Sequence, residues 1–461
     1  MHEPSPQQPL TRAVLREARA SLALGWPLVL TNIAQVALIA TDLIFVGRLG
    51  KNELAATAMA ASLYQAVMLF SMGIVSASML LMARTLGRDP HAVDDIRRTV
   101  TQGLWSAGLI SVPAWALLWH CDSIFVLLGQ DPDLAARSTG FMHALQWGLL
   151  PYLGYIVLRS FLAAMQRPLW TMLVAAVAAA FNALAGWCLI YGHLGFPALG
   201  LTGAGLATSG AMVVLFLGLV VVVGLDRRFR GYRLFQGLWR PDLKRLAEIW
   251  RLGLPIGMAQ AFETSIFYAS AMMMGLLGAT ALAAHAIVAQ IGGATFMAAI
   301  GLSQAASVRV GRAHGAADPA AARLAGWTAY GLTVAYMLIV AAVMLVTPKT
   351  LIGVFIDTEA PLNRDVVLLA STLLICAALF QLGDGIQVAC LGMLRGLHDT
   401  SVPMLLTAIG YWGIGMPLGA TLAFVWGFGG VGIWLGLASG LSAVAVLTTW
   451  RWARLSARLG T

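Results

Sequence analysis

Long apolar stretches, separated by short polar and basic segments, follow one another along nearly the whole chain. Each stretch has the length of about 20 residues that an α-helix needs to cross the hydrocarbon core of a bilayer. A soluble protein could not bury this much apolar surface, whereas lipid solvates it. The pattern predicts twelve membrane-spanning helices, over approximately 22–46, 54–80, 99–120, 138–158, 168–191, 199–224, 252–275, 281–305, 324–347, 366–394, 401–424 and 430–450.

The chain also resembles itself, because its second half repeats residues of its first half at a constant spacing. Leu24-Gly25-Trp26-Pro27 recurs as Leu252-Gly253-Leu254-Pro255, and in the same register Gly73 meets Gly301 without a gap. Six spans in each half is an even number, so both halves have the same orientation in the bilayer. We therefore predict an all-α polytopic membrane protein with two pseudo-symmetric six-helix bundles. Its predicted parts are an N-terminal segment (1–20), an N-lobe (21–225), a basic linker (226–251), a C-lobe (252–450) and a C-terminal tail (451–461).

Composition agrees with a membrane protein, since 59% of the residues are hydrophobic and 11% are charged. A net charge of +9 could indicate nucleic-acid binding, but the distribution of the basic residues indicates membrane topology instead. With both termini in the cytoplasm, the inner segments hold 24 of the 29 Lys and Arg residues, including Arg159 and the eight between Arg227 and Arg251. This asymmetry is the positive-inside rule. The linker is predicted as a surface helix or a solvated loop, and no nucleic-acid partner is expected.

Two acidic residues of the second half lie deep inside predicted spans. Glu263 follows Arg251, and Asp384 precedes Arg395, by about three helical turns each. Both are therefore about 17 Å from the inner boundary, near the bilayer midplane. An ionised carboxylate costs at least about 2.5–3.5 kcal/mol at this depth, which favours a site for a hard cation such as Na⁺, a shared proton, or a structural acid that stays protonated. Polar side chains flank them one turn away: Gln260, Thr264, Gln381 and Gln387.

A third acid, Asp42, lies in the outer half of the first span, six residues before Arg48. Gln35 and Thr31 continue its face at helical spacing. Asn182 reaches a similar depth on the fifth span. We expect either a second polar site within the N-lobe or an acid that only holds helices together.

Several short motifs follow one another along the chain. They are Thr41-Asp42-Leu-Ile-Phe-Val-Gly47, Gly253-Leu-Pro255 with Phe262-Glu263, Ala283-Ala-His285, Ser307-Val-Arg309-Val-Gly311, and Asp384-Gly-Ile-Gln387 leading into Leu394-Arg395-Gly396. In this order and spacing they resemble the multidrug and toxic compound extrusion (MATE) family, in its NorM-like bacterial branch. The resemblance covers roughly residues 15–450.

The resemblance implies a cation-binding site at Glu263 and Asp384, with the aromatic Phe380 placed against the ion. It also implies an N-lobe network at Asp42 and Asn182, linked to substrate or protons, and Gln35 belongs to the same predicted site.

Two positions depart from the family pattern and bear on that N-lobe site. Gly186 stands where a second asparagine is expected, and Ala286 stands where a glutamine is common. These departures are expected to narrow or alter the contacts with substrate.

The predicted function is multidrug efflux across the bacterial inner membrane. Small organic, often cationic compounds would be exchanged for Na⁺ or H⁺ by alternating access, which would confer antibiotic resistance. We expect no enzymatic activity, no resident metal and no cofactor other than the coupling ion. The expected form is a functional monomer in the lipid bilayer, with both termini cytoplasmic.

Two alternatives remain at this point. A flippase for lipid-linked precursors has a related architecture, but it should show a basic cleft for phosphate, and no Lys or Arg is predicted in mid-span. A membrane-embedded enzyme would need a nucleophile, a metal set or an acid/base pair, and the sequence shows no such constellation.

Overall fold

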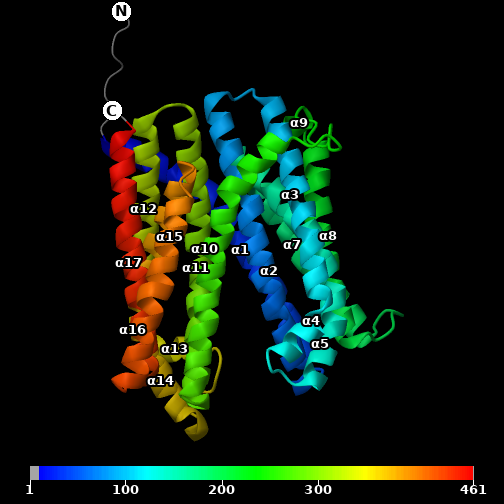
Figure 1. Cartoon of the computed structure of the whole chain (residues 1–461), viewed down its shortest axis with the longest axis vertical. Helices are drawn as coiled ribbons and strands as arrows, with labels where there is room; N and C mark the ends of the chain where they lie inside the picture. Colours follow the sequence, from blue (N-terminus) through cyan, green and yellow to red (C-terminus); the bar gives the residue numbers. More distant parts are fainter. Residues whose placement is uncertain (1–9, 460–461) are drawn as a thin grey trace, which may run out of the picture. The chain divides into compact units, whose positions relative to one another are not determined.

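The structure is a computed structural model, which describes residues 10–459, and these residues form helices joined by short loops (Figure 1). The first half contains α1 (Leu10–Gly47), α2 (Lys51–Arg88), α3 (Val93–Trp119), α4 (Cys121–Leu127), α5 (Pro132–Leu145), η1 (Gln146–Gly148), α6 (Leu149–Ala164), α7 (Leu169–Tyr191), α8 (Gly200–Leu225) and α9 (Arg227–Arg230). The second half contains α10 (Leu243–Leu276), α11 (Ala279–Gly315), α12 (Pro319–Val346), α13 (Pro348–Ile352), η2 (Pro361–Asn363), α14 (Arg364–Gly396), α15 (Ser401–Ala408), η3 (Ile409–Gly415), α16 (Met416–Ala420), η4 (Thr421–Val425) and α17 (Gly429–Arg458).

All twelve predicted apolar stretches lie in helical segments of this structure. Within residues 10–459, ten segments are long and apolar enough to cross a membrane, and eleven if α3 and α4, bent by 59°, form one broken span. The remaining stretch lies in α10, where Gln260, Glu263 and Thr264 interrupt the apolar run. The prediction of an all-helical polytopic membrane protein is confirmed. Residues 1–9 of the predicted N-terminal segment and 460–461 of the predicted tail lie outside the described residues.

The chain forms two compact units, and the division between them falls inside two helices. Unit 1 contains Met1–Val29 and Ser265–Thr461, and unit 2 contains Leu30–Thr264. Both α1 and α10 therefore pass from one unit into the other. The lobe bounds 21–225 and 252–450 follow the repeat in the sequence and stay a prediction.

The fourth span of each sequence half lies at the centre of its unit. In unit 2, α6 packs against α2, α3 and α8, and in unit 1, α14 packs against α11, α12 and α17. Glycine permits one of these close approaches, because a Cβ on Gly385 of α14 would lie 2.3 Å from Cγ of Met337 in α12. These two central helices therefore bring the polar residues that they carry into the interior of each unit.

Two close helix contacts follow the register of the internal repeat. In unit 2, a Cβ on Gly73 of α2 would lie 2.5 Å from Cα of Gly257 in α10. In unit 1, a Cβ on Gly301 of α11 would lie 2.9 Å from the backbone N of Val29 in α1. In the register that aligns Pro27 with Pro255, Gly301 is equivalent to Gly73, and Gly257 is equivalent to Val29. In both places the first helix of one sequence half packs against the second helix of the other half.

Candidate functional site

The clearest polar site of unit 2 is centred on Asp42 of α1, whose side chain is 8% exposed. The Asn182 amide of α7 donates a hydrogen bond to Asp42 Oδ1 at 2.7 Å. The Thr208 hydroxyl of α8 donates to Asp42 Oδ2 at 2.6 Å. Asn182 is fully buried and Thr208 is 6% exposed. The structure thus brings Asp42 and Asn182 together, as the sequence led us to expect.

One atom of this site has no partner. Asn182 Oδ1 is buried and accepts no hydrogen bond from any described residue, whereas Asn182 Nδ2 also lies 3.5 Å from the backbone oxygen of Leu38. A buried acceptor without a donor costs free energy. The Asn182 oxygen can therefore accept a hydrogen bond from a water molecule or a protonated acid, or coordinate a cation.

Gln35 was predicted to join this site, and the structure does not bond it to Asp42. It lies seven residues before Asp42 on α1, which corresponds to about 10 Å along the helix. Gln35 is half-buried, and its Nε2 atom has no hydrogen-bond partner among the described residues. Thr31, one turn further, lies 3.4 Å from the Thr171 hydroxyl of α7. The predicted polar face of α1 exists, but its members have different partners.

Arg159 lies in a helix and not in the inner segment that the sequence predicts for it. The apolar pattern predicts a span ending at residue 158, but α6 continues to Ala164 and Arg159 is buried within it. It donates a hydrogen bond to Asn32 Oδ1 of α1 at 2.7 Å. Because a charged residue commonly ends an apolar run, the sequence pattern ended this span too early. Arg159 lies five residues before the end of α6, so the structure corrects the predicted end of this span and not the expectation that no Lys or Arg lies in mid-span.

In unit 1, Asp384 of α14 is 4% exposed and lies between two anchored amides. Gln381 Nε2 donates to the backbone oxygen of Gly292 at 3.0 Å and to the Thr295 hydroxyl at 2.6 Å, both on α11. Gln387 Oε1 accepts a hydrogen bond from the Tyr411 hydroxyl at 2.8 Å. The turns before and after Asp384 are therefore fixed to neighbouring helices.

Phe380 lies one turn before Asp384, in a group of aromatic side chains. Its ring contacts Phe267 of α10 and Trp434 of α17 edge to face, with centroids 5.9 and 5.6 Å apart. His285 of α11 lies 5.6 Å from Trp434. His285 Nδ1 and Trp434 Nε1 are both buried without a hydrogen-bond partner in the described part of the chain. Aromatic faces next to a carboxylate are suited to a monovalent cation.

Glu263 is half-buried on α10 and belongs to unit 2, whereas Asp384 belongs to unit 1. Their convergence on one cation stays a prediction. Among the described residues, no group of three or more His, Cys, Asp or Glu side chains is placed to hold a metal ion.

Thr208, Phe267 and Trp434 contribute to these sites but are not among the residues that the sequence predicts. A weak signal existed for Thr208. It lies eight residues after the start of α8 at Gly200, and Asn182 lies ten residues before Gly192, the residue that follows α7. Both therefore reach a similar depth on consecutive antiparallel helices. The aromatic partners of Phe380 come from two helices, α10 and α17, and no local spacing connects them.

The MatE family profile matches residues 27–188 and 255–421. The two matches begin at Pro27 and Pro255, which are equivalent residues of the internal repeat. The chain is 57% identical to "Probable multidrug resistance protein NorM" of Brucella suis over 439 residues, with 95% of this chain and 93% of the relative covered. It is 51% identical to the protein of the same name from Mesorhizobium japonicum, with 95% and 94% covered.

Solved structures have the same fold at low sequence identity. The eukaryotic MATE transporter AtDTX14 superimposes with a TM-score of 0.86 at 21% identity, covering 97% of this chain and 99% of that one. An outward-facing multidrug resistance MATE family transporter superimposes with a TM-score of 0.85 at 18% identity, covering 97% and 98%. From its two family matches, its close relatives and its fold, this chain belongs to the MATE family and is a multi-pass membrane transporter rather than an enzyme.

Proposed function

We propose that this chain is an inner-membrane multidrug efflux antiporter, which exports small organic, often cationic compounds in exchange for Na⁺ or H⁺. Relatives that carry the name of a multidrug resistance protein support the cargo class. The observation that carries the coupling is the burial of Asp384 within an apolar helix. A carboxylate at such a position needs a compensating cation, a proton or a hydrated cavity.

In this proposal the coupling ion binds at Asp384 and Glu263, beside Phe380. The carboxylates supply the charge, and the Phe380 ring adds a favourable face for a cation. A bound ion shifts the equilibrium between inward- and outward-facing states only if it binds them with different affinity. The surroundings of at least one carboxylate must therefore change during the cycle.

The Asp42 site of unit 2 has the composition of a site linked to protons or to substrate. An ionised Asp42 accepts hydrogen bonds from Asn182 and Thr208. A protonated Asp42 would itself need an acceptor, and Asn182 Oδ1 is a buried acceptor without a donor. An ionised Asp42 therefore has partners on α7 and α8, whereas a protonated Asp42 would need the Asn182 amide to turn its oxygen toward the acid.

The positive-inside asymmetry supports cytoplasmic termini, because basic segments are retained on that side of the membrane. We propose a functional monomer. Nucleic acid has no part in the proposal.

The membrane potential limits what the exchange can achieve. One charge that crosses about 100 mV gains about 2.3 kcal/mol, which supports a gradient of roughly 50-fold for a neutral substrate. Exchange of one monovalent cationic drug for one Na⁺ moves no net charge, so it would draw only on the concentration gradient of the ion.

The test is drug efflux from proteoliposomes with Na⁺ and pH gradients imposed separately. We expect Glu263→Gln and Asp384→Asn to lose ion-driven efflux while the protein remains folded in the membrane. Asp365→Asn is the matched control on α14, because Asp365 is exposed in the first turn of the same helix. Glu248→Gln is the matched control on α10, where Glu248 is exposed.

Wild-type coupled efflux in both Glu263→Gln and Asp384→Asn would reject the ion site. Equal loss in the control variants would also reject it, because the effect would then not be specific to the buried acids. The gradient that drives efflux in the wild-type protein identifies the ion.

A further inference from the structure

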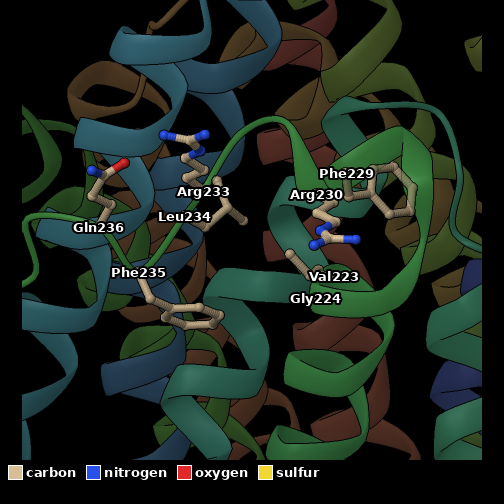
Figure 2. A pocket seen from close by; sticks show the side chains of 8 residues that line it. All are labelled: Val223, Gly224, Phe229, Arg230, Arg233, Leu234, Phe235 and Gln236. Atoms are coloured by element: carbon tan, nitrogen blue, oxygen red, sulfur yellow. The ribbon is translucent and has the colours of Figure 1, made fainter.

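A cavity of about 320 Å³ lies where α8 ends and the chain turns into α9. Two arginines, Arg230 and Arg233, line it together with apolar side chains, and Figure 2 shows them on the two sides of the bend that links α9 to the following turn. The apolar lining consists of Val223, Phe229, Leu234 and Phe235. This cavity is separate from both acidic sites and takes no part in the transport steps proposed above.

The lining of the cavity carries positive charge and no acid. Arg230 and Arg233 are exposed, and neither forms an ion pair with a described residue. The nearest acid in the sequence, Asp226, accepts hydrogen bonds from the backbone N of Arg228 at 3.0 Å and from Trp170 Nε1 at 3.2 Å. A second cavity, of about 390 Å³, differs because its Arg451 is paired with Asp399 at 2.5 Å. The first cavity therefore presents two guanidinium groups available to an anion.

The walls of the cavity are held by packing against α3 and α6, so the basic linker is not a freely solvated loop. Phe229 is 1% exposed and packs on Phe161 with ring centroids 5.6 Å apart. Trp105 Nε1 of α3 donates to the backbone oxygen of Leu238 at 2.7 Å. Arg233 has a φ of 45°, in the left-handed region that non-glycine residues occupy only when their surroundings impose it.

An exposed apolar stripe on α8 ends at Leu225, the residue after Gly224, which lines the cavity. Leu217, Val221 and Leu225 are 51%, 54% and 76% exposed, and they follow one another every four residues on one face of this candidate span. Trp239, further along the linker, is 88% exposed, and tryptophan is enriched where a membrane surface meets water. Positive charge at the end of an exposed apolar stripe matches a phospholipid, whose phosphate and acyl chains are joined in the same order.

We propose that Arg230 and Arg233 bind the phosphate of an anionic membrane lipid, whose acyl chain lies along Leu217, Val221 and Leu225. Basic pockets beside membrane spans are known to bind anionic headgroups. Free phosphate shares the headgroup chemistry, but it would leave the apolar stripe and the apolar lining unused. The lipid is therefore the committed ligand.

The test measures lipid binding to the purified full-length protein by native mass spectrometry, with phosphatidylglycerol and phosphatidylcholine as probes. We expect preferential retention of phosphatidylglycerol, weakened about 30-fold in the Arg230→Gln/Arg233→Gln variant. The matched control is Arg227→Gln/Arg240→Gln, which removes two exposed cations of the same segment outside the cavity. This control should keep the wild-type preference to within about fivefold.

Three outcomes would overturn the proposal: undiminished phosphatidylglycerol binding in Arg230→Gln/Arg233→Gln, equal loss in both double variants, or displacement of the lipid by inorganic phosphate at equal concentration. Thermal unfolding in phosphatidylcholine nanodiscs checks folding, and the first double variant should match the wild type there. If it does not, the single variants, each expected to weaken binding about fivefold, decide the same question. Because no transport is measured, a failure here is distinguishable from a failure of the efflux proposal.

Discussion

Asp42 in unit 2 and Asp384 in unit 1 are both buried acids on long apolar helices, and their surroundings differ. Asp42 receives one hydrogen bond on each carboxylate oxygen, from a neutral amide and a neutral hydroxyl. The amides that flank Asp384, Gln381 and Gln387, are bonded to other groups, and Phe380 one turn away belongs to an aromatic group. The first acid is stabilised by hydrogen-bond donors, and the second has surroundings suited to a cation.

Two acids of similar burial in one chain can therefore have different roles. A carboxylate with two donors is stabilised as an anion without any ion, because hydrogen bonds to a charged group are worth about 1.5–3 kcal/mol each. A carboxylate beside aromatic faces gains most when a cation enters. We therefore expect the unit 1 site to set ion affinity and the unit 2 site to set the stability of its network and its response to protons.

If Na⁺ rather than H⁺ is the coupling ion, the largest expected effect is on sodium binding by the unit 1 site. Asp384→Asn removes a charge that compensates the ion and should weaken ²²Na⁺ binding by at least about tenfold. Asp42→Asn should leave binding within about threefold of the wild type. Scintillation proximity with purified protein measures both. If Asp42→Asn weakens binding as much as Asp384→Asn, the two sites do not have separate roles.

The next effect is on the hydrogen-bond network of unit 2. Thr208→Val leaves Asp42 Oδ2 without its donor, which should lower the free energy of unfolding by about 1–3 kcal/mol. Thr208→Ser keeps the hydroxyl and should recover most of this loss. Thermal unfolding of Thr208→Val, of Asp42→Asn and of the double variant measures the coupling between the two residues. Strict additivity would show that Thr208 does not act through Asp42.

A smaller effect should distinguish the aromatic residues of the two units. Phe380→Leu should weaken ²²Na⁺ binding about threefold to tenfold, whereas Phe380→Tyr keeps the ring face and should change it less than about threefold. Phe45→Leu is the matched control in unit 2, since Phe45 also packs edge to face, with Tyr191 at 6.0 Å. An equal loss in Phe45→Leu would assign the effect to general packing.

The smallest effect concerns Asp242, a half-buried acid before α10 that serves as a reference for the two buried acids. Asp242 accepts hydrogen bonds from the Arg98 side chain, and this contact holds the pKa of Asp242 below its ordinary value of 3.8. Its stabilising contribution is complete above the ordinary pKa and is lost as the pH falls through the lowered pKa. Because Arg98 is 54% exposed, screening keeps the contribution below about 0.5 kcal/mol. Thermal unfolding of Asp242→Asn between pH 3 and pH 7 measures it, and a larger loss at pH 7 would show a further structural role.

The sequence predicts the fold well because the decisive signal is local. Apolar stretches of span length and the internal repeat can be read without knowing any contact, and the contacts of Gly73 and Gly301 follow that repeat. The end of the fourth span was wrong because Arg159 is a charge that the interior accepts through Asn32. A hydropathy pattern cannot show that a charged residue has a partner on a helix distant in sequence.

The candidate sites were predictable only in part. Asp42 and Asp384 are conspicuous because acids are rare in apolar helices, and the family resemblance added Asn182 and Phe380. Thr208 could not be chosen from sequence alone, since hydroxyl side chains in membrane helices commonly bond to the backbone of their own helix. The aromatic residues that contact Phe380 could not be chosen either, because an aromatic side chain at any position of a membrane helix could equally face lipid.

The passage of α1 and α10 from one unit into the other has a consequence for biosynthesis. Gly25 and Val29 of α1 pack against α11, which belongs to the second half of the chain. The packing of unit 1 therefore cannot be completed until the ribosome has synthesised most of the polypeptide, although α1 is inserted first. A gene divided within the linker should yield two fragments that each lack a packing partner, so activity should return only when both are made in the same cell.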